Sequence, residues 1–263
     1  MTARPGDRWR EMIAARAVPE EISGRAPGPP RRGLEPERFR WRPEVDAAQP
    51  ERPSRRRALE ALPEGGSALD VGCGGGASSL GLGQKAGLIV GVDRSEAMLA
   101  SFEESARKAG INVRSVQGDW PAVGDEVEPV DVAVSHHAVY GVAEIEAFLE
   151  ALTAHARHRA VLEVSVNGPQ AVLAPLWKAF HGVERPLQPV ADMAEELLRA
   201  MGYDVEREDT VAPPRADGVT PEAVAFARRR LFVGPERDPE IEAFLRRAPQ
   251  EHRVVALWWS GRA

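Results

Sequence analysis

The sequence predicts an α/β fold in which helices cover both faces of a parallel, doubly wound sheet. Two observations predict it. From Ser67 onward, short apolar runs alternate with helical stretches, a pattern typical of parallel strands joined by crossover helices. The first of these apolar runs also ends in a glycine cluster, at the kind of strand-to-helix turn where open α/β sheets bind their ligands.

Seven apolar runs are short enough to be strands. We expect them at residues 68–71, 88–92, 113–116, 130–134, 160–164, 203–209 and 253–259. Apolar residues at helical spacing, with Ser95 as a capping residue and Gly202 as a stop, predict the helices between them. These helices are expected at residues 77–85, 96–108, 143–158 and 191–201, with further helical segments at about 171–181 and 219–247.

The first 54 residues form a different region. Residues 1–66 carry 14 arginines and 11 acids, and hence a net positive charge, whereas the whole chain of 263 residues carries −6. We interpret the arginine bias as a property of the coding sequence, with bidentate anion binding as the alternative. We predict an arm at residues 1–54, followed by one domain at 55–263 with insertions at about 166–190 and 212–250. Our hypothesis is that the arm and one insertion form a lid over the substrate.

Composition excludes several classes of protein. The 43% hydrophobic and 28% charged residues are a globular balance, and no apolar run approaches the ~18 residues of a membrane span. The N-terminus lacks the apolar stretch of a secretory signal, and the single cysteine, Cys73, cannot form an intramolecular disulfide. We therefore expect a cytoplasmic protein that does not act on a membrane. The net negative charge makes nucleic acid an unlikely main partner.

The strongest chemical signal is the sequence Leu-Asp-Val-Gly-Cys-Gly-Gly-Gly at residues 69–76. Glycines let a ligand approach the backbone closely, and free amides at this turn can meet a polar group. Asp93 ends the second strand, 21 residues after Gly72, where a carboxylate can accept hydrogen bonds from both ribose hydroxyls of an adenosine. Gly118-Asp119-Trp120 follows the third strand, where an acid can accept from an exocyclic amine and an aromatic ring can cover an adenine face.

These motifs, in this order, resemble the class I S-adenosylmethionine-dependent methyltransferases, and the small-molecule branch called methyltransferase type 11 is the most similar. The resemblance covers about residues 61–164 clearly. It rests on the glycine motif, on Gly-Val-Asp-Arg-Ser-Glu-Ala-Met-Leu at 91–99, on Asp119, and on Asp131 in the fourth strand. It implies a Rossmann-like sheet of seven strands whose last strand is antiparallel. It also implies S-adenosylmethionine as cofactor and S-adenosylhomocysteine as product.

The resemblance implies roles for matching positions. Gly72 and Gly74 would line the methionine part of the cofactor, and Asp70 would help to set the loop. Asp93 would hold the ribose, and Asp119 with Trp120 would flank the adenine. Ser135 and His136 would lie near the methionine amine and the sulfonium. The full set of expected cofactor-binding residues is Asp70, Gly72, Cys73, Gly74, Asp93, Arg94, Met98, Gly118, Asp119, Trp120, Ser135 and His136.

Candidate catalytic groups follow the fourth strand, in Ser-His-His-Ala-Val-Tyr at 135–140. A histidine can accept a proton near neutral pH, so His136 and His137 are candidate bases, and Tyr140 is a candidate for orienting the substrate. This segment differs from the Asn/Asp-Pro-Pro-Tyr tetrad of many enzymes that methylate exocyclic or amide nitrogens. We therefore predict methyl transfer to an oxygen or nitrogen nucleophile of a small molecule. Glu163 ends the fifth strand and is either a second acid at the site or a surface ion pair, and we favour the surface pair.

Alternatives remain open from the sequence. The protein is alternatively an RNA or protein methyltransferase, or a cofactor-binding protein without catalysis. An NAD(P)-binding oxidoreductase is the rival from another reaction class, because Gly72, Gly74 and Ala77 satisfy a relaxed dinucleotide fingerprint. Asp70 favours the methyltransferase, since a carboxylate there would repel a pyrophosphate but not a cationic methionine end. We expect no metal site and make no prediction of the oligomeric state.

Overall fold

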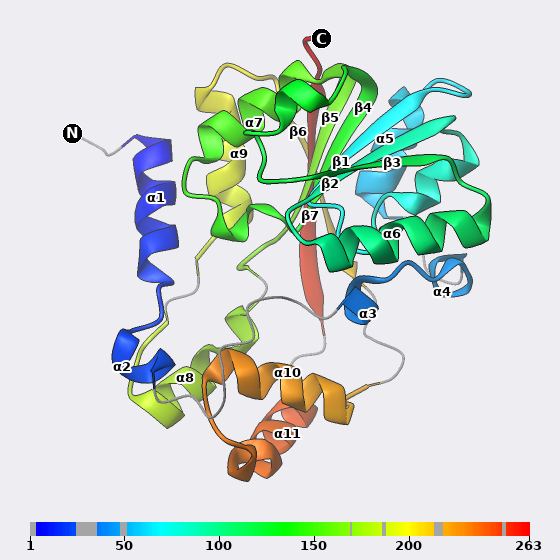
Figure 1. The fold of residues 1–263 in the computed structure, drawn as a ribbon. Coiled ribbons are helices and arrows are strands. Elements are labelled where there is room, and N and C mark those ends of the chain that lie inside the picture. Colours follow the sequence, from blue (N-terminus) through cyan, green and yellow to red (C-terminus); the bar gives the residue numbers. More distant parts are fainter. Residues whose placement is uncertain are drawn as a thin grey trace.

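The computed structural model describes residues 4–24, 36–47, 52–168, 170–185, 188–212, 218–248 and 251–263. The centre of the fold is a seven-stranded sheet in the order β3-β2-β1-β4-β5-β7-β6 (Figure 1). The first five strands along the chain are parallel, and β7 runs antiparallel to both of its neighbours. This confirms the predicted fold class, including the antiparallel last strand.

The strands lie close to the predicted runs. Their bounds are β1 Ser67–Val71, β2 Leu88–Asp93, β3 Val113–Gln117, β4 Val130–His136, β5 Ala156–Ser165, β6 Glu206–Ala212 and β7 His252–Ser260. The sixth strand was predicted three residues too early, because Tyr203 and Val205 are buried by packing at the end of the preceding helix rather than by strand pairing. The strand β5 starts at Ala156, so the helix predicted to reach residue 158 ends at Ala154.

Helices cover both faces of the sheet, as expected. One face carries α5 (Pro53–Ala61) and α6 (Glu96–Ala109), and the other carries α1 (Pro5–Ala15), α7 (Ile145–Ala154) and α9 (Val190–Ala200). The predicted helix at 77–85 is instead the short 3₁₀ helix Leu80–Gln84. Its sequence, Leu-Gly-Leu-Gly-Gln, contains two glycines, and each of them disfavours an α-helix by ~1 kcal/mol.

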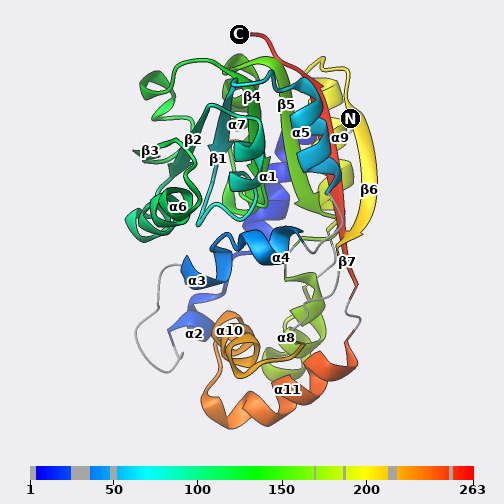
Figure 2. The same cartoon turned by 90° about the vertical axis from the view of Figure 1, so that its right-hand side faces the viewer.

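A second, smaller core lies beyond the sheet. It is built by α8 (Ala174–His181), α10 (Pro221–Leu231) and α11 (Asp238–Arg247), together with Val18 and Ile22 of the arm. We call this unit the helical cap. Because β5 leads into α8 and α11 leads into β7, the cap faces the carboxyl ends of the parallel strands (Figures 1 and 2). Two short arm helices, α3 (Pro36–Phe39) and α4 (Pro43–Ala47), lie between sheet and cap (Figure 2).

Candidate active site

The loop after β1 is held in place by the end of β2. The backbone amides of Gly72 and Cys73 donate to the Val92 carbonyl at 2.8 and 3.1 Å. Asp93 then uses both carboxylate oxygens, accepting from Gly74 N at 3.0 Å and from Ser95 N at 2.9 Å. Gly72 has a φ of +77°, and a Cβ there would lie 2.3 Å from the Cβ of Ala138. Only glycine therefore fits at this turn.

A buried carboxylate lies directly before this loop. Asp70 is fully buried in β1, and neither of its carboxylate oxygens has a hydrogen-bond partner among the described residues. Burial raises the pKa of Asp70 to about 7, although the nearby Ser79 hydroxyl favours the charged form. A buried, unsatisfied acid is costly unless a cation or a donor meets it. The residues of this loop therefore fit the cationic methionine end of S-adenosylmethionine.

An arm segment covers the glycine loop. Residues 39–41, which we call the strap, form an antiparallel bridge from Arg40 to Gly76, and Trp41 N donates to the Gly75 carbonyl at 3.1 Å. A Cβ on Gly75 would lie 2.7 Å from the carbonyl oxygen of Phe39, so the strap approaches as closely as glycine allows. This pairing was not predicted, because a backbone bridge leaves no side-chain pattern in the sequence.

The other expected cofactor residues near this loop differ in burial. Met98 and Cys73 are buried beneath it, whereas Arg94 and Asp119 are exposed at the ends of β2 and β3. Gly118 is packed against Val123. Trp120 donates from Nε1 to the Phe148 carbonyl of α7 at 3.2 Å. Its ring meets the His155 ring edge-on, with the two ring centroids 4.8 Å apart. The indole thus bridges the β3 loop and α7, and its role against an adenine stays a prediction.

The two residues that end β4 are buried. Ser135 Oγ donates to the Val71 carbonyl at 2.9 Å, which links β4 to the end of β1. His136 is 8% exposed, and its Nε2 has no partner among the described residues. Burial lowers the pKa of His136 to about 4, partly opposed by the charge of Glu163. His136 is therefore a neutral ring at pH 7 and is suited to hydrogen bonding rather than to taking up a proton.

His137 has a different environment. Its φ is +57°, a left-handed conformation that costs a non-glycine residue ~1 kcal/mol and occurs preferentially at functional sites. The turn directs the ring toward β5, where Nε2 lies 3.1 Å from Glu163 Oε1. Nδ1 lies 2.8 Å from the Tyr140 hydroxyl, which in turn accepts from Ser165 N at 2.7 Å. Glu163, His137 and Tyr140 thus form one hydrogen-bonded chain.

Glu163 corrects the sequence analysis. It was expected to form a surface pair, but it is 1% exposed and contacts His137, Ser54 Oγ and Arg52. Burial favours its neutral form, but the hydrogen bond from His137 and the nearby charges outweigh burial and hold its pKa well below the usual range. The sequence missed this role because Ser54 and Arg52 are more than 100 residues away from Glu163 along the chain.

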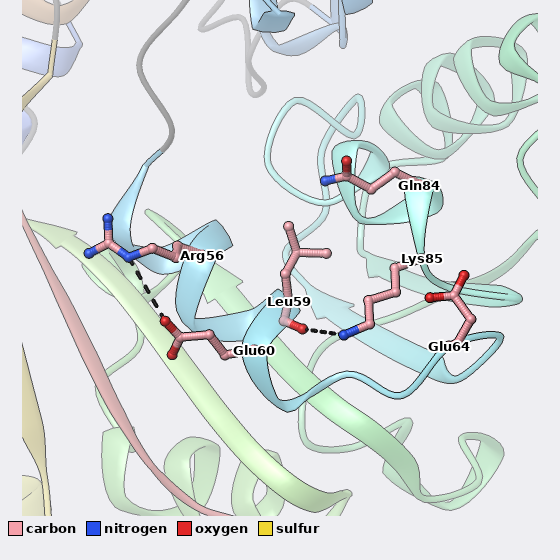
Figure 3. A pocket seen from close by; sticks show the side chains of 6 residues that line it. All are labelled: Arg56, Leu59, Glu60, Glu64, Gln84 and Lys85. Carbon is pink, nitrogen blue, oxygen red and sulfur yellow. Dashed lines mark hydrogen bonds and ion pairs between the residues drawn. The ribbon is translucent and has the colours of Figure 1, made fainter.

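A surface hollow on α5 is a separate feature (Figure 3). It is lined by Arg56, Leu59, Glu60, Glu64, Gln84 and Lys85. Lys85 Nζ donates to the Leu59 carbonyl at 2.9 Å, and Arg56 lies 4.0 Å from Glu60. Residues 84 and 85 precede β2, so this part of the hollow lies at the end of the sheet opposite the glycine loop. The hollow is therefore not part of the candidate active site.

Comparison with known proteins shows which proteins this chain resembles. Residues 68–159 match a family model described as a methyltransferase domain. The chain is 29% identical over 189 residues to a ubiquinone biosynthesis O-methyltransferase of Rhizobium rhizogenes, covering 71% of this chain and 69% of the relative. A protein of the same name from Azorhizobium caulinodans is 31% identical over 149 residues, which cover 52% of this chain and 58% of that relative.

The chain carries a methyltransferase domain, and its relatives and fold support a class I S-adenosylmethionine-dependent methyltransferase. It is therefore an enzyme, and S-adenosylmethionine is its cofactor. Two solved structures share its fold. YcgJ from Bacillus subtilis is 14% identical with a TM-score of 0.55, over 80% of this chain and 98% of that one. A Synechocystis magnesium protoporphyrin IX methyltransferase with bound S-adenosylhomocysteine is 16% identical with a TM-score of 0.50, over 96% and 92%.

Two further findings concern the residues that the structure describes. No helix among them is long and apolar enough to cross a bilayer. They also contain no group of three or more histidine, cysteine, aspartate or glutamate side chains placed to hold a metal ion.

Proposed function

We propose that this methyltransferase acts on an oxygen or nitrogen nucleophile of a small molecule, and that the chain Glu163–His137–Tyr140 takes up the proton that the nucleophile loses. The observation that carries the proposal is this hydrogen-bonded chain, which starts from the buried Glu163 and lies at the carboxyl ends of β4 and β5, beside the glycine loop. The names of the two curated relatives, both O-methyltransferases, support an oxygen acceptor. The acidic balance and the single cysteine support a cytoplasmic enzyme that does not act on nucleic acid.

The cofactor residues follow from the same edge of the sheet. Asp93 would accept from the ribose hydroxyls, Asp70 would face the methionine ammonium group, and the backbone of Gly72 and Gly74 would line the space between them. His136, with its unpartnered and neutral ring, would donate or accept one hydrogen bond there. When bound, S-adenosylmethionine supplies an activated methyl group on its sulfonium.

The protein's own task is to align the nucleophile and remove its proton. Burial raises the pKa of Tyr140 to about 12, so its hydroxyl remains protonated at pH 7. This hydroxyl accepts from Ser165 N, donates to Ser165 Oγ at 3.0 Å and lies 2.8 Å from His137 Nδ1. A phenol oxygen has one proton and two lone pairs, so the relay requires that an acceptor hydroxyl replace Ser165 Oγ as its partner and deliver its proton there. As that proton arrives on Tyr140, the tyrosine's own proton passes to His137 Nδ1. Glu163 accepts from Nε2–H and stabilises the imidazolium that forms.

We also propose that the strap and the helical cap enclose the substrate. The strap contacts the glycine loop directly, and the cap faces the carboxyl ends of the strands. The arm at residues 1–54 is thus part of the site, and the segments near 166–190 and 212–250 contribute the cap. Removing the whole arm would not test this, because Trp9 is fully buried in the main core.

The test uses labelled S-adenosylmethionine, a panel of small hydroxylated and aminated metabolites, and RNA and protein as controls. We expect transfer to at least one small molecule. Tyr140→Phe should then lower kcat at least tenfold and leave the affinity for S-adenosylhomocysteine unchanged. Tyr203→Phe is the matched control, since Tyr203 packs on Trp259 away from the site. Transfer to RNA or protein only would contradict the acceptor class, and full activity of Tyr140→Phe would contradict the relay.

A further inference from the structure

One arginine of the arm reaches the candidate acceptor side of the site. Arg16 follows the last turn of α1, and its guanidinium lies against Gly168, three residues after the end of β5. A Cβ on Gly168 would lie 2.5 Å from Arg16 Nη2, and the φ of Gly168 is +82°. The backbone at this glycine therefore leaves room for the guanidinium. Because Ser165 bonds to the Tyr140 hydroxyl, this position is close to the proposed relay.

A second arginine meets the first from the helical cap side. Arg185 follows α8, and its Nη1 and Nη2 donate to the main-chain carbonyls of Arg16 and Ala17 at 2.8 and 3.4 Å. Its guanidinium also stacks over the Trp177 ring, with Cζ 3.9 Å from the ring centroid. These contacts fix Arg185 beside the end of α1, yet its Nε has no partner among the described residues.

Neither arginine has an acidic partner among the residues that the structure describes. Among the described residues, no carboxylate lies within ion-pair distance of Arg16 or Arg185, whereas Arg8 and Arg10, on the same helix as Arg16, are both paired with acids. Burial lowers the pKa of both guanidinium groups, and the charge of Arg185 lowers that of Arg16 further. Two half-buried cations of the same sign repel each other and lose hydration, and an anion between them would offset both costs.

We propose that Arg16 and Arg185 form an anion subsite for the methyl acceptor, which is therefore a small molecule carrying a carboxylate or phosphate besides its nucleophile. This inference rests on the proposed function of the same site. The planar guanidinium fork of Arg16 matches both oxyanions bidentately, whereas Arg185, whose Nη1 and Nη2 donate to main-chain carbonyls, adds a fixed positive charge. Because one arginine comes from the arm and the other from the cap side, a bound anion also holds these two segments together.

The test compares three probes of similar shape: benzoate, phenyl phosphate and the neutral benzamide. Their binding is measured by calorimetry or NMR, with and without S-adenosylhomocysteine. We expect at least one anion to bind about tenfold more tightly than benzamide, and the stronger of the two identifies the oxyanion. In Arg16→Gln the ratio of the affinity for the anion to the affinity for benzamide should fall to about one. Arg8→Gln, which removes an exposed and paired arginine from the same helix, should keep it.

Several outcomes would overturn the subsite. Equal binding of all three probes to the wild-type protein is one, and it does not depend on any variant. A preference that survives in both Arg16→Gln and Arg185→Gln is another, since the anion would then bind elsewhere. Failure of S-adenosylhomocysteine to bind would instead contradict the proposed cofactor residues. The comparison of probes without that ligand would still decide the subsite.

Discussion

The two halves of the carboxyl edge of the sheet differ in charge. The half formed by β1, β2 and β3 ends in the acids Asp70, Asp93 and Asp119. The half formed by β4 and β5 is surrounded by histidines and by arm arginines, and its one acid, Glu163, is already engaged by His137 and Arg52. A cofactor with a sulfonium and an ammonium group suits the first half, and an anionic acceptor suits the second. The two halves therefore differ in the charge of the ligand that each one suits.

The largest effect is expected on the acidic half. Asp93→Ala removes the acceptor of the Gly74 and Ser95 amides together with the proposed ribose contacts. Because hydrogen bonds to a charged group contribute ~1.5–3 kcal/mol each, affinity for S-adenosylhomocysteine should fall at least ~100-fold by calorimetry. Glu96→Gln, an exposed acid three residues further on, is the control and should change little. Unchanged affinity of Asp93→Ala would place the cofactor elsewhere.

A change in the other half should leave the cofactor bound. Glu163→Gln keeps the size of the side chain but removes the charge that stabilises the imidazolium of His137. We expect kcat to fall roughly 30-fold, less than for loss of a general base, with affinity for S-adenosylhomocysteine unchanged. The acidic limb of the kcat profile should also move to lower pH, a shift that a purely structural role would not produce. Glu60→Gln on the surface of α5 is the control. Loss of cofactor affinity in Glu163→Gln would show that the two halves are not separate.

The smallest effect concerns Asp70 and depends on pH. Its pKa is about 7, so cofactor affinity should rise roughly tenfold between pH 6 and pH 8 as the carboxylate ionises. Asp70→Asn should remove this dependence. Because the native pKa is raised, Asp70 contributes stability below about pH 4 that is lost as pH rises through 7, and denaturation of the free protein should show this slope. A pH-independent affinity of the wild-type protein would contradict the assignment of Asp70 to the ammonium.

The features that were predicted correctly depend on residues close together along the chain. The glycines at 72 and 74 lie in the turn after β1, and Asp93 and the capping Ser95 lie in the turn from β2 to α6, so each pair belongs to one short segment of the chain. The segment 135–140 was also identified, but the sequence did not separate its two histidines. Their difference arises because β4 buries His136 while the left-handed turn at His137 directs that ring to Glu163. The α-helix predicted at 77–85 does not form, because the low helix propensity of Gly81 and Gly83 outweighs the apolar spacing.

Local patterns were enough to predict the sheet, most of its crossover helices and the acids of the glycine-loop half, and the family resemblance supplied the cofactor class. Apolar periodicity and turn-forming residues act between neighbours along the chain, so they can be recognised in a single sequence. The burial of Glu163 against Ser54 and the position of the strap over Gly75 became visible only in the folded chain. Folding also brought Arg16 beside Arg185. These contacts join segments far apart in the chain. Their energies depend on burial and on nearby charge, which exist only once the chain has folded.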